Sequence, residues 1–320
     1  MTSAAGRRRS RRPFRRILLA VAFVFVVGIL GATFAVTTDT LGAGRLFDRA
    51  VAKVERFLAG PVPDRPTIAT VRVTPRPATP SPTLPAPEPT SDPAASGPPH
   101  TPTPTPTPKP TPKRVPVDVE IAANPEAIFA HQLTKTWCAP ASVQMTLAYL
   151  GLADISDEFQ RKVHGRIREW ESKSDSLNGN WGPAAMALAL EAYGASGYEV
   201  RAYEGRQEAL RDAAVALEAT GSPVILLTWR GAHTWVMTGF RANADPAIFP
   251  DARISGAYIL DPWYPSVSSL WGPSDPPGTF QDNAEMVRNY LRWNRPEGIY
   301  PDRDGLFIAL VPTVVVKPAD

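Results

Sequence analysis

Seventeen of the 42 residues from 75 to 116 are proline, and residues 101–107 alternate threonine with proline. Such a segment has little apolar surface to bury and favours extended polyproline geometry. At about 3.1 Å per residue it could reach on the order of 130 Å. We therefore expect a disordered Pro/Thr-rich linker at 75–116, and a folded domain can form only outside it.

The N-terminal arm has the pattern of a membrane anchor. Seven arginines between residues 7 and 16 precede an uncharged apolar run, Ile17 to Val36. Twenty helical residues span roughly 30 Å, about one bilayer core, and the arginines should stay cytoplasmic. We interpret 1–16 as a cytoplasmic tail, 17–36 as a single transmembrane helix and 37–74 as a juxtamembrane segment. A cleaved signal peptide remains the alternative, and it too would export the rest of the chain.

The charge of the chain is divided between its two halves. Residues 1–116 carry 17 Lys and Arg against 6 Asp and Glu, whereas residues 117–320 carry 17 against 25. The C-terminal half therefore has a net charge near −8, although the whole chain has +3. The basic excess belongs to the arm, so we expect no nucleic-acid partner for the domain.

Residues 117–320 are predicted to form one folded domain. Helical periodicity dominates its first half, and short apolar or alternating runs dominate its second half. This order predicts an α+β fold with an antiparallel sheet. We expect helices at about 139–150, 157–171, 183–193 and 207–219, and strands at about 115–121, 198–203, 223–227, 233–240, 257–261 and 306–312.

The only cysteine, Cys138, stands at or directly before the N-terminus of the first of these helices, whose first turn contains Pro140. A thiolate is favoured at a helix N-terminus, where free N–H groups and the positive end of the dipole face it. In an exported protein a lone cysteine is an oxidation liability unless it is buried or useful. Six residues upstream, the amide of Gln132 could donate to an oxyanion. Cys138 is therefore a candidate nucleophile.

Among the four histidines, His233 is the candidate base, because it begins an apolar strand at the rim of the predicted sheet. His100 lies in the linker, His164 on a helix face that we take to be solvated, and His131 is expected to have a turn or cap role. Asp261 ends the next strand and could orient the imidazole if the two strands pair. It could equally open a turn at the Asp-Pro pair, and both roles are compatible.

Together these segments resemble the peptidase domain of the bacteriocin-processing, double-glycine-leader family, and more closely its stand-alone relatives in bacterial exported proteins. The segments are Gln132, Trp137-Cys138-Ala139-Pro140-Ala141-Ser142, Gly221-Ser222-Pro223-Val224-Ile225, Gly231-Ala232-His233-Thr234-Trp235-Val236 and Tyr258-Ile259-Leu260-Asp261-Pro262. The resemblance covers about residues 117–312 and implies a papain-like cysteine peptidase fold. It also implies that Cys138 is the nucleophile, Gln132 the oxyanion donor, His233 the general base and Asp261 the orienting acid.

The chain departs from the family pattern in three ways. Ala139 stands where the family often has glycine, no transporter is attached, and an insert from Tyr264 to Phe280 has no clear equivalent. Four aromatic residues could line a substrate groove, with packing over the sheet as the alternative. These are Trp137, Trp235, Trp263 and Trp271.

The resemblance implies a cysteine peptidase that acts on a peptide or protein substrate without a cofactor. The N-terminal arginine cluster and apolar run predict that this peptidase is membrane-tethered and extracytoplasmic. We expect no metal, because the chain has no second cysteine or closely spaced histidine pair, and the sequence Asp302-Arg303-Asp304-Gly305 lacks further calcium ligands. A cell-wall amidase or endopeptidase, or a transglutaminase-like acyl transferase, could use the same triad. A catalytically inactive, stalked peptide-binding module is the alternative from another class.

Overall fold

A computed structural model describes residues 68–74, 112–176, 180–294 and 297–316, with Ala50, Val54 and Leu58 as isolated helical positions. The chain divides into two units, Met1–Val62 and Pro63–Asp320, and the described sheet belongs to the second. The predicted membrane anchor at 17–36 and almost all of the predicted linker lie outside the described residues. Within the described ranges, no helix is both long and apolar enough to cross a bilayer.

The second unit is built on one sheet in the order β1-β3-β10-β4-β5-β6-β9, with β2 also pairing with β5. Every pair is antiparallel except the parallel pair of β1 and β3. The strands are β1 (Val71–Arg72), β2 (Val117–Glu120), β3 (Tyr198–Tyr203), β4 (Val224–Thr228), β5 (His233–Ala242), β6 (Ile254–Leu260), β9 (Thr279–Asp282) and β10 (Phe307–Pro312). A separate hairpin consists of β7 (Val267–Ser268) and β8 (Gly272–Pro273).

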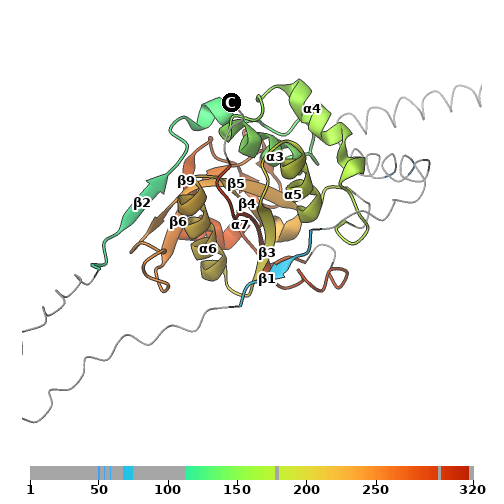
Figure 1. The fold of residues 1–320 in the computed structure, drawn as a ribbon. Helices are drawn as coiled ribbons and strands as arrows, with labels where there is room; N and C mark the ends of the chain where they lie inside the picture. The colour runs from blue at the N-terminus through green and yellow to red at the C-terminus, as the bar shows by residue number, and fades with distance from the viewer. Residues whose placement is uncertain are drawn as a thin grey trace, which may run out of the picture. The chain divides into compact units, whose positions relative to one another are not determined.

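Helices cover both faces of this sheet (Figure 1). Helices α3 and α5 pack on one face, against β5 and β3, while α6 crosses the other face and α7 packs against β6 and β9. Their bounds are α3 (Cys138–Tyr149), α4 (Asp157–Gly165), α5 (Pro183–Ala192), α6 (Arg206–Thr220) and α7 (Asn283–Asn289), with short 3-10 segments at Pro125–Ile128, Ile167–Glu169 and Trp229–Gly231.

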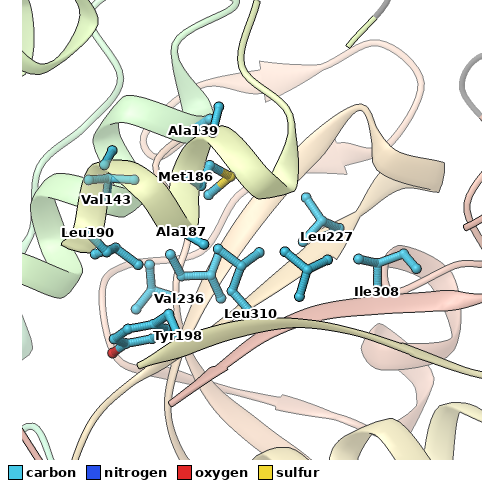
Figure 2. Packing of buried hydrophobic residues seen from close by; sticks show 14 of the residues in the cluster. Ala139, Val143, Met186, Ala187, Leu190, Tyr198, Leu227, Val236, Ile308 and Leu310 are labelled. Atoms are coloured by element: carbon cyan, nitrogen blue, oxygen red, sulfur yellow. The ribbon is translucent and has the colours of Figure 1, made fainter. Parts of the chain in front are cut away.

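Two hydrophobic clusters, one on each face, explain why β4 is a continuous apolar run. Ile225 and Leu227 join the cluster under α3 and α5, whereas Val224 and Leu226 join the cluster under α6. Successive strand side chains point to opposite faces, so a strand covered on both faces needs apolar residues throughout. Figure 2 shows side chains of the first cluster, including Val143 of α3, meeting the sheet. Each such buried side chain contributes about 1.5–3 kcal/mol.

A buried ion pair joins two loops that are distant in sequence. Arg303 Nη1 lies 3.0 Å from Asp175 Oδ1, and both side chains are 2% exposed. Asp175 also accepts the backbone N–H groups of Ala184 and Ala185, and thereby caps the first turn of α5. Burial raises the pKa of Asp175, and Arg303 and these hydrogen bonds oppose that rise. The segment 302–305 is thus part of the structural framework around α5.

The α+β prediction is confirmed, and most predicted elements are present within a few residues of their expected ends. The predicted helix at 157–171 is instead broken at Gly165, after which a 3-10 turn follows. Strand β9 and helix α7 were not predicted, and neither was the strand Val71–Arg72, which the sequence interpretation placed in the juxtamembrane segment. These short elements have too few residues for a clear periodicity.

Candidate active site

Cys138 is the first residue of α3, as the sequence predicted, and its side chain is partly exposed. The rest of the helix is anchored, because Ala139 to Leu147 are all buried. Two of its buried polar side chains are hydrogen-bonded: Ser142 shares a hydrogen bond with Thr234 of β5, and the Gln144 amide donates to the carbonyls of Asp154 and Ser156. The thiol therefore stands at a fixed helix N-terminus.

His233 and Asp261 meet because β5 and β6 pair with Val236 opposite Leu260. His233 Nε2 lies 2.7 Å from Asp261 Oδ1, and the His233 side chain is 2% exposed. The same carboxylate oxygen accepts the backbone N–H of Trp263 at 2.9 Å, which fixes the turn after β6. Asp261 therefore begins a turn and also hydrogen-bonds the imidazole. The sequence analysis found these two roles compatible.

The remaining ring nitrogen of His233, Nδ1, is left for the thiol, and the Cys138 side chain is close enough to the ring to raise the pKa of His233. Burial lowers the pKa of His233, but the Asp261 carboxylate and the contacts with Cys138 more than offset this and raise it to about 9. The imidazole is therefore protonated near neutral pH. Cysteine, histidine and aspartate, contributed by three different elements, form one connected group.

Gln132 lies on the segment that leads into α3, and this segment is tied to the turn after Asp261. The backbone N–H of Gln132 donates to the Pro262 carbonyl at 2.8 Å. Its side-chain Nε2 donates to the Thr134 carbonyl at 2.7 Å, while Oε1 is buried with no hydrogen-bond partner among the described residues. An amide nitrogen carries two N–H groups, so one remains after the bond to Thr134.

His164 was expected on a solvated helix face, and this expectation is wrong. Its ring stacks on Trp137 with the centroids 4.0 Å apart, and its Nδ1 accepts a hydrogen bond from Trp181 Nε1 at 3.1 Å. Burial lowers the pKa of His164 to about 4, so the ring is neutral at pH 7. Trp137, which precedes Cys138, is thereby packed onto α4. His131 is exposed, and its carbonyl accepts from Gln160.

Three of the four aromatic residues predicted for a groove, Trp137, Trp235 and Trp263, have different positions. Trp235 is 3% exposed and lies in the cluster beneath α6, so it belongs to the core and cannot line a groove. Trp263 is partly exposed and meets the His233 ring edge to face, with centroids 6.3 Å apart. Trp137 is partly exposed beside the thiol residue. Packing over the sheet, the alternative reading, thus holds for Trp235.

Sequence reasoning missed Trp229, which covers the His233 ring. The two rings are stacked with centroids 4.0 Å apart and an interplanar angle of 21°. Trp271, from the insert after Tyr264, stacks in turn on Trp229 at 5.8 Å. The available signal was the position of Trp229 between the central strand and the tight turn before His233, but nothing in the sequence indicates the direction of its side chain.

In the described ranges, no group of three or more His, Cys, Asp or Glu side chains is placed to hold a metal ion. Asp302 and Asp304, the residues that faintly suggest calcium in the sequence, flank the buried Arg303, and Asp304 accepts the backbone N–H of Gly298.

An α+β fold with a cysteine at a helix N-terminus and a histidine–aspartate pair on adjacent strands is the arrangement of a papain-like cysteine peptidase. Residues 126–295 match the sequence model of the Peptidase_C39 like family, and this range contains Gln132, Cys138, His233 and Asp261. The chain belongs to this family of cysteine peptidases. The match confirms the resemblance inferred from the sequence.

One solved structure is also similar to this chain. It is described as the crystal structure of a double glycine motif protease from an AMS/PCAT transporter in complex with the leader peptide. It is 20% identical, the similarity covers 58% of this chain and 91% of that one, and the TM-score is 0.28. Among curated proteins, no match was found.

Proposed function

We propose that this chain hydrolyses peptide bonds with Cys138 as nucleophile, His233 as general acid and base, and Asp261 as the orienting group. The observation that carries the proposal is the connected geometry of these three side chains. Asp261 lies 2.7 Å from one ring nitrogen of His233, and Cys138 at the start of α3 is close enough to the ring to raise the pKa of His233. This is the arrangement of an activated nucleophile, a base and a third group that orients the base.

The proposed reaction begins with a proton shared between Cys138 and His233. The thiolate attacks the carbonyl carbon of the peptide bond, and the oxyanion is held by the Cys138 backbone N–H and an N–H of Gln132. Protonated His233 then donates to the leaving amine. Water hydrolyses the thioester while His233 takes its proton, and the sulfur leaves as the thiolate, which restores the thiolate–imidazolium pair. Asp261 stabilises the imidazolium and fixes the ring so that Nδ1 faces the sulfur.

Thiol alkylation tests this proposal without knowledge of the substrate, because Cys138 is the only cysteine in the chain. Iodoacetamide should modify Cys138 rapidly at pH 7 in the wild type and slowly in His233→Ala. Peptide-library hydrolysis should be lost in Cys138→Ala. Slow alkylation in the wild type, or an equal rate in His233→Ala, would show that the two residues are not a functional pair.

The acceptor of the acyl group decides between the enzymes that share this triad. Release of new peptide N-termini with water as acceptor supports the peptidase. Cleavage of cell-wall peptides alone would identify the amidase or endopeptidase, and transfer to an added amine would identify the acyl transferase. Rapid alkylation without turnover of any of these substrates would favour the catalytically inactive peptide-binding module over the enzyme functions.

We further propose that the domain lies outside the cytoplasm and is tethered through residues 17–36. The support is the arginine cluster before this apolar run and the proline-rich segment after it. Protease added to intact cells whose outer barrier has been opened should release a soluble domain fragment. A domain that stays protected until the inner membrane is lysed would contradict this placement. An N-terminal tag that remains with the membrane would distinguish the anchor from a cleaved signal peptide.

A further inference from the structure

Trp229 has a backbone conformation that tryptophan rarely adopts. Its φ is 50°, and the next two residues, Arg230 and Gly231, also have positive φ values of 63° and 86°. For non-glycine residues this left-handed region costs about 1–2 kcal/mol each. A Cβ at Gly231 would approach the Trp293 ring to 2.4 Å, so the turn is closely packed as well. Such strain persists only where the surroundings fix the conformation.

The surroundings fix Trp229 from two sides. Its Nε1 donates to Asn289 Oδ1 on α7 at 2.9 Å, and both residues are buried. The Asn289 amide in turn donates to the backbone carbonyl of Glu285 one turn earlier on α7, so its orientation is defined. On the other side, Trp271 stacks almost parallel to the indole, with an interplanar angle of 7°. The indole face is thereby held flat against the His233 ring.

We propose that Trp229 is a positioning residue that fixes the His233 ring and stabilises its protonated form through the face of the indole. The inference rests on the proposed function, because a stable imidazolium beside Cys138 matters only if the thiolate is used. An indole face carries partial negative charge and attracts a cation within about 6 Å of its centroid. The 4.0 Å stacking at 21° meets this condition.

The contact between the Trp229 indole and the His233 ring matters because the His233 ring is buried. The His233 ring is almost fully excluded from water, and burial alone disfavours its charged form. The titratable groups that face the ring are Asp261 after β6 and Cys138 at the start of α3. A carboxylate reaches one edge of the ring and the thiol the other, so the indole supplies a stabilising contact on a face that neither of them covers.

The test measures the pKa of His233 directly, by NMR of the full-length chain with labelled histidine. Four histidines are present, and the His233 signal is assigned by its loss in His233→Ala. A Cys138→Ala background lets the ring titrate without the thiol, so the result does not depend on whether the chain is a peptidase. Trp229→Leu should lower the pKa by about 0.5–1 unit, and Trp229→Phe by less, because a phenyl face is the weaker partner.

Trp235→Leu is the matched control, because it removes another buried indole two positions along β5 from His233. It should reduce stability and leave the pKa of His233 unchanged. In the Cys138-containing chain, the alkaline limb of the kcat/KM profile should move to lower pH in the Trp229 variants only.

Two results would overturn the inference. An unchanged pKa in a folded Trp229→Phe or Trp229→Leu variant would mean that Trp229 only packs. A raised pKa would mean that its main effect is to exclude water. If the pKa falls as expected but no variant or wild type cleaves peptides, the contact stands and the proposed peptidase activity fails.

Discussion

Ser142 of α3 and Thr234 of β5 share a buried hydrogen bond, with their hydroxyl oxygens 2.8 Å apart. Ser142 lies one helical turn after Cys138, and Thr234 directly follows His233. The bond therefore joins the helix that carries the thiol to the strand that carries the imidazole. Because both partners are fully buried or nearly so, each would be unsatisfied without the other.

Thr234→Val should destabilise the fold by about 1–3 kcal/mol, because it leaves the Ser142 hydroxyl buried without a partner. We also expect turnover to fall, since the thiol and the ring lose the contact that sets their relative position. Urea unfolding and peptide-library turnover measure the two effects. The double variant Ser142→Ala/Thr234→Val is the control and should recover much of the stability. Equal stability of the single and double variants would show that the bond contributes little.

Gln132→Ala should lower kcat by about 10²–10³, because the proposed amide donor acts where charge develops on the carbonyl oxygen. Alkylation of Cys138 should stay near the wild-type rate, since that reaction builds no oxyanion. Gln132→Glu keeps the length of the side chain and removes the N–H donors, so its kcat should be about as low as that of Gln132→Ala. Near wild-type turnover in either variant would exclude the oxyanion role and leave Gln132 with the loop contact to Thr134 that the structure shows.

Two histidines, the buried His233 and the half-buried His164, should make the free energy of unfolding fall on both sides of neutral pH. In the folded chain the pKa of His233 is raised to about 9. The stability that its protonation contributes is therefore fully present below its unfolded pKa of about 6.5, and it is lost as the pH rises through 9. His164 has a folded pKa lowered to about 4, so the unfolded chain binds the proton first, and stability falls as pH drops from about 6.5 to 4.

The free energy of unfolding, measured with urea between pH 4 and 10, tests the loss of stability at acid pH and the loss at alkaline pH separately. His164→Phe keeps a ring against Trp137 and should flatten the acid side only. Asp261→Asn removes the charge that favours imidazolium and should flatten the alkaline side only. A wild-type stability independent of pH from 7 to 10 would contradict the assignment of a raised pKa to His233.

Arg303→Met should cost about 3–5 kcal/mol, because it leaves the Asp175 carboxylate buried without its ion-pair partner. The free energy of unfolding measures the loss. Asp175→Asn in the same background should restore part of it, since it removes the buried charge and its amide oxygen can still accept one of the two N–H groups that begin α5. A loss below about 1 kcal/mol in Arg303→Met would mean that the pair is not needed for the domain.

The sequence alone determined the elements with strong local patterns and the identity of the triad candidates. Cys138 before a helix with Pro140 in its first turn, and His233 at the start of an apolar strand, were placed correctly. Local patterns suffice there because capping, proline geometry and a continuous apolar run act on the backbone within a few residues.

Only the tertiary structure decided which side chains surround these residues. The sequence placed His164 on a solvated face and Trp235 in a possible groove, yet His164 stacks on Trp137 and Trp235 lies under α6. Trp229, which the sequence analysis did not single out, covers the His233 ring. The Asp175–Arg303 pair likewise joins residues 128 positions apart. The physical reason is that periodicity reports which side of an element is apolar, whereas the neighbour on that side is set by how distant elements pack together.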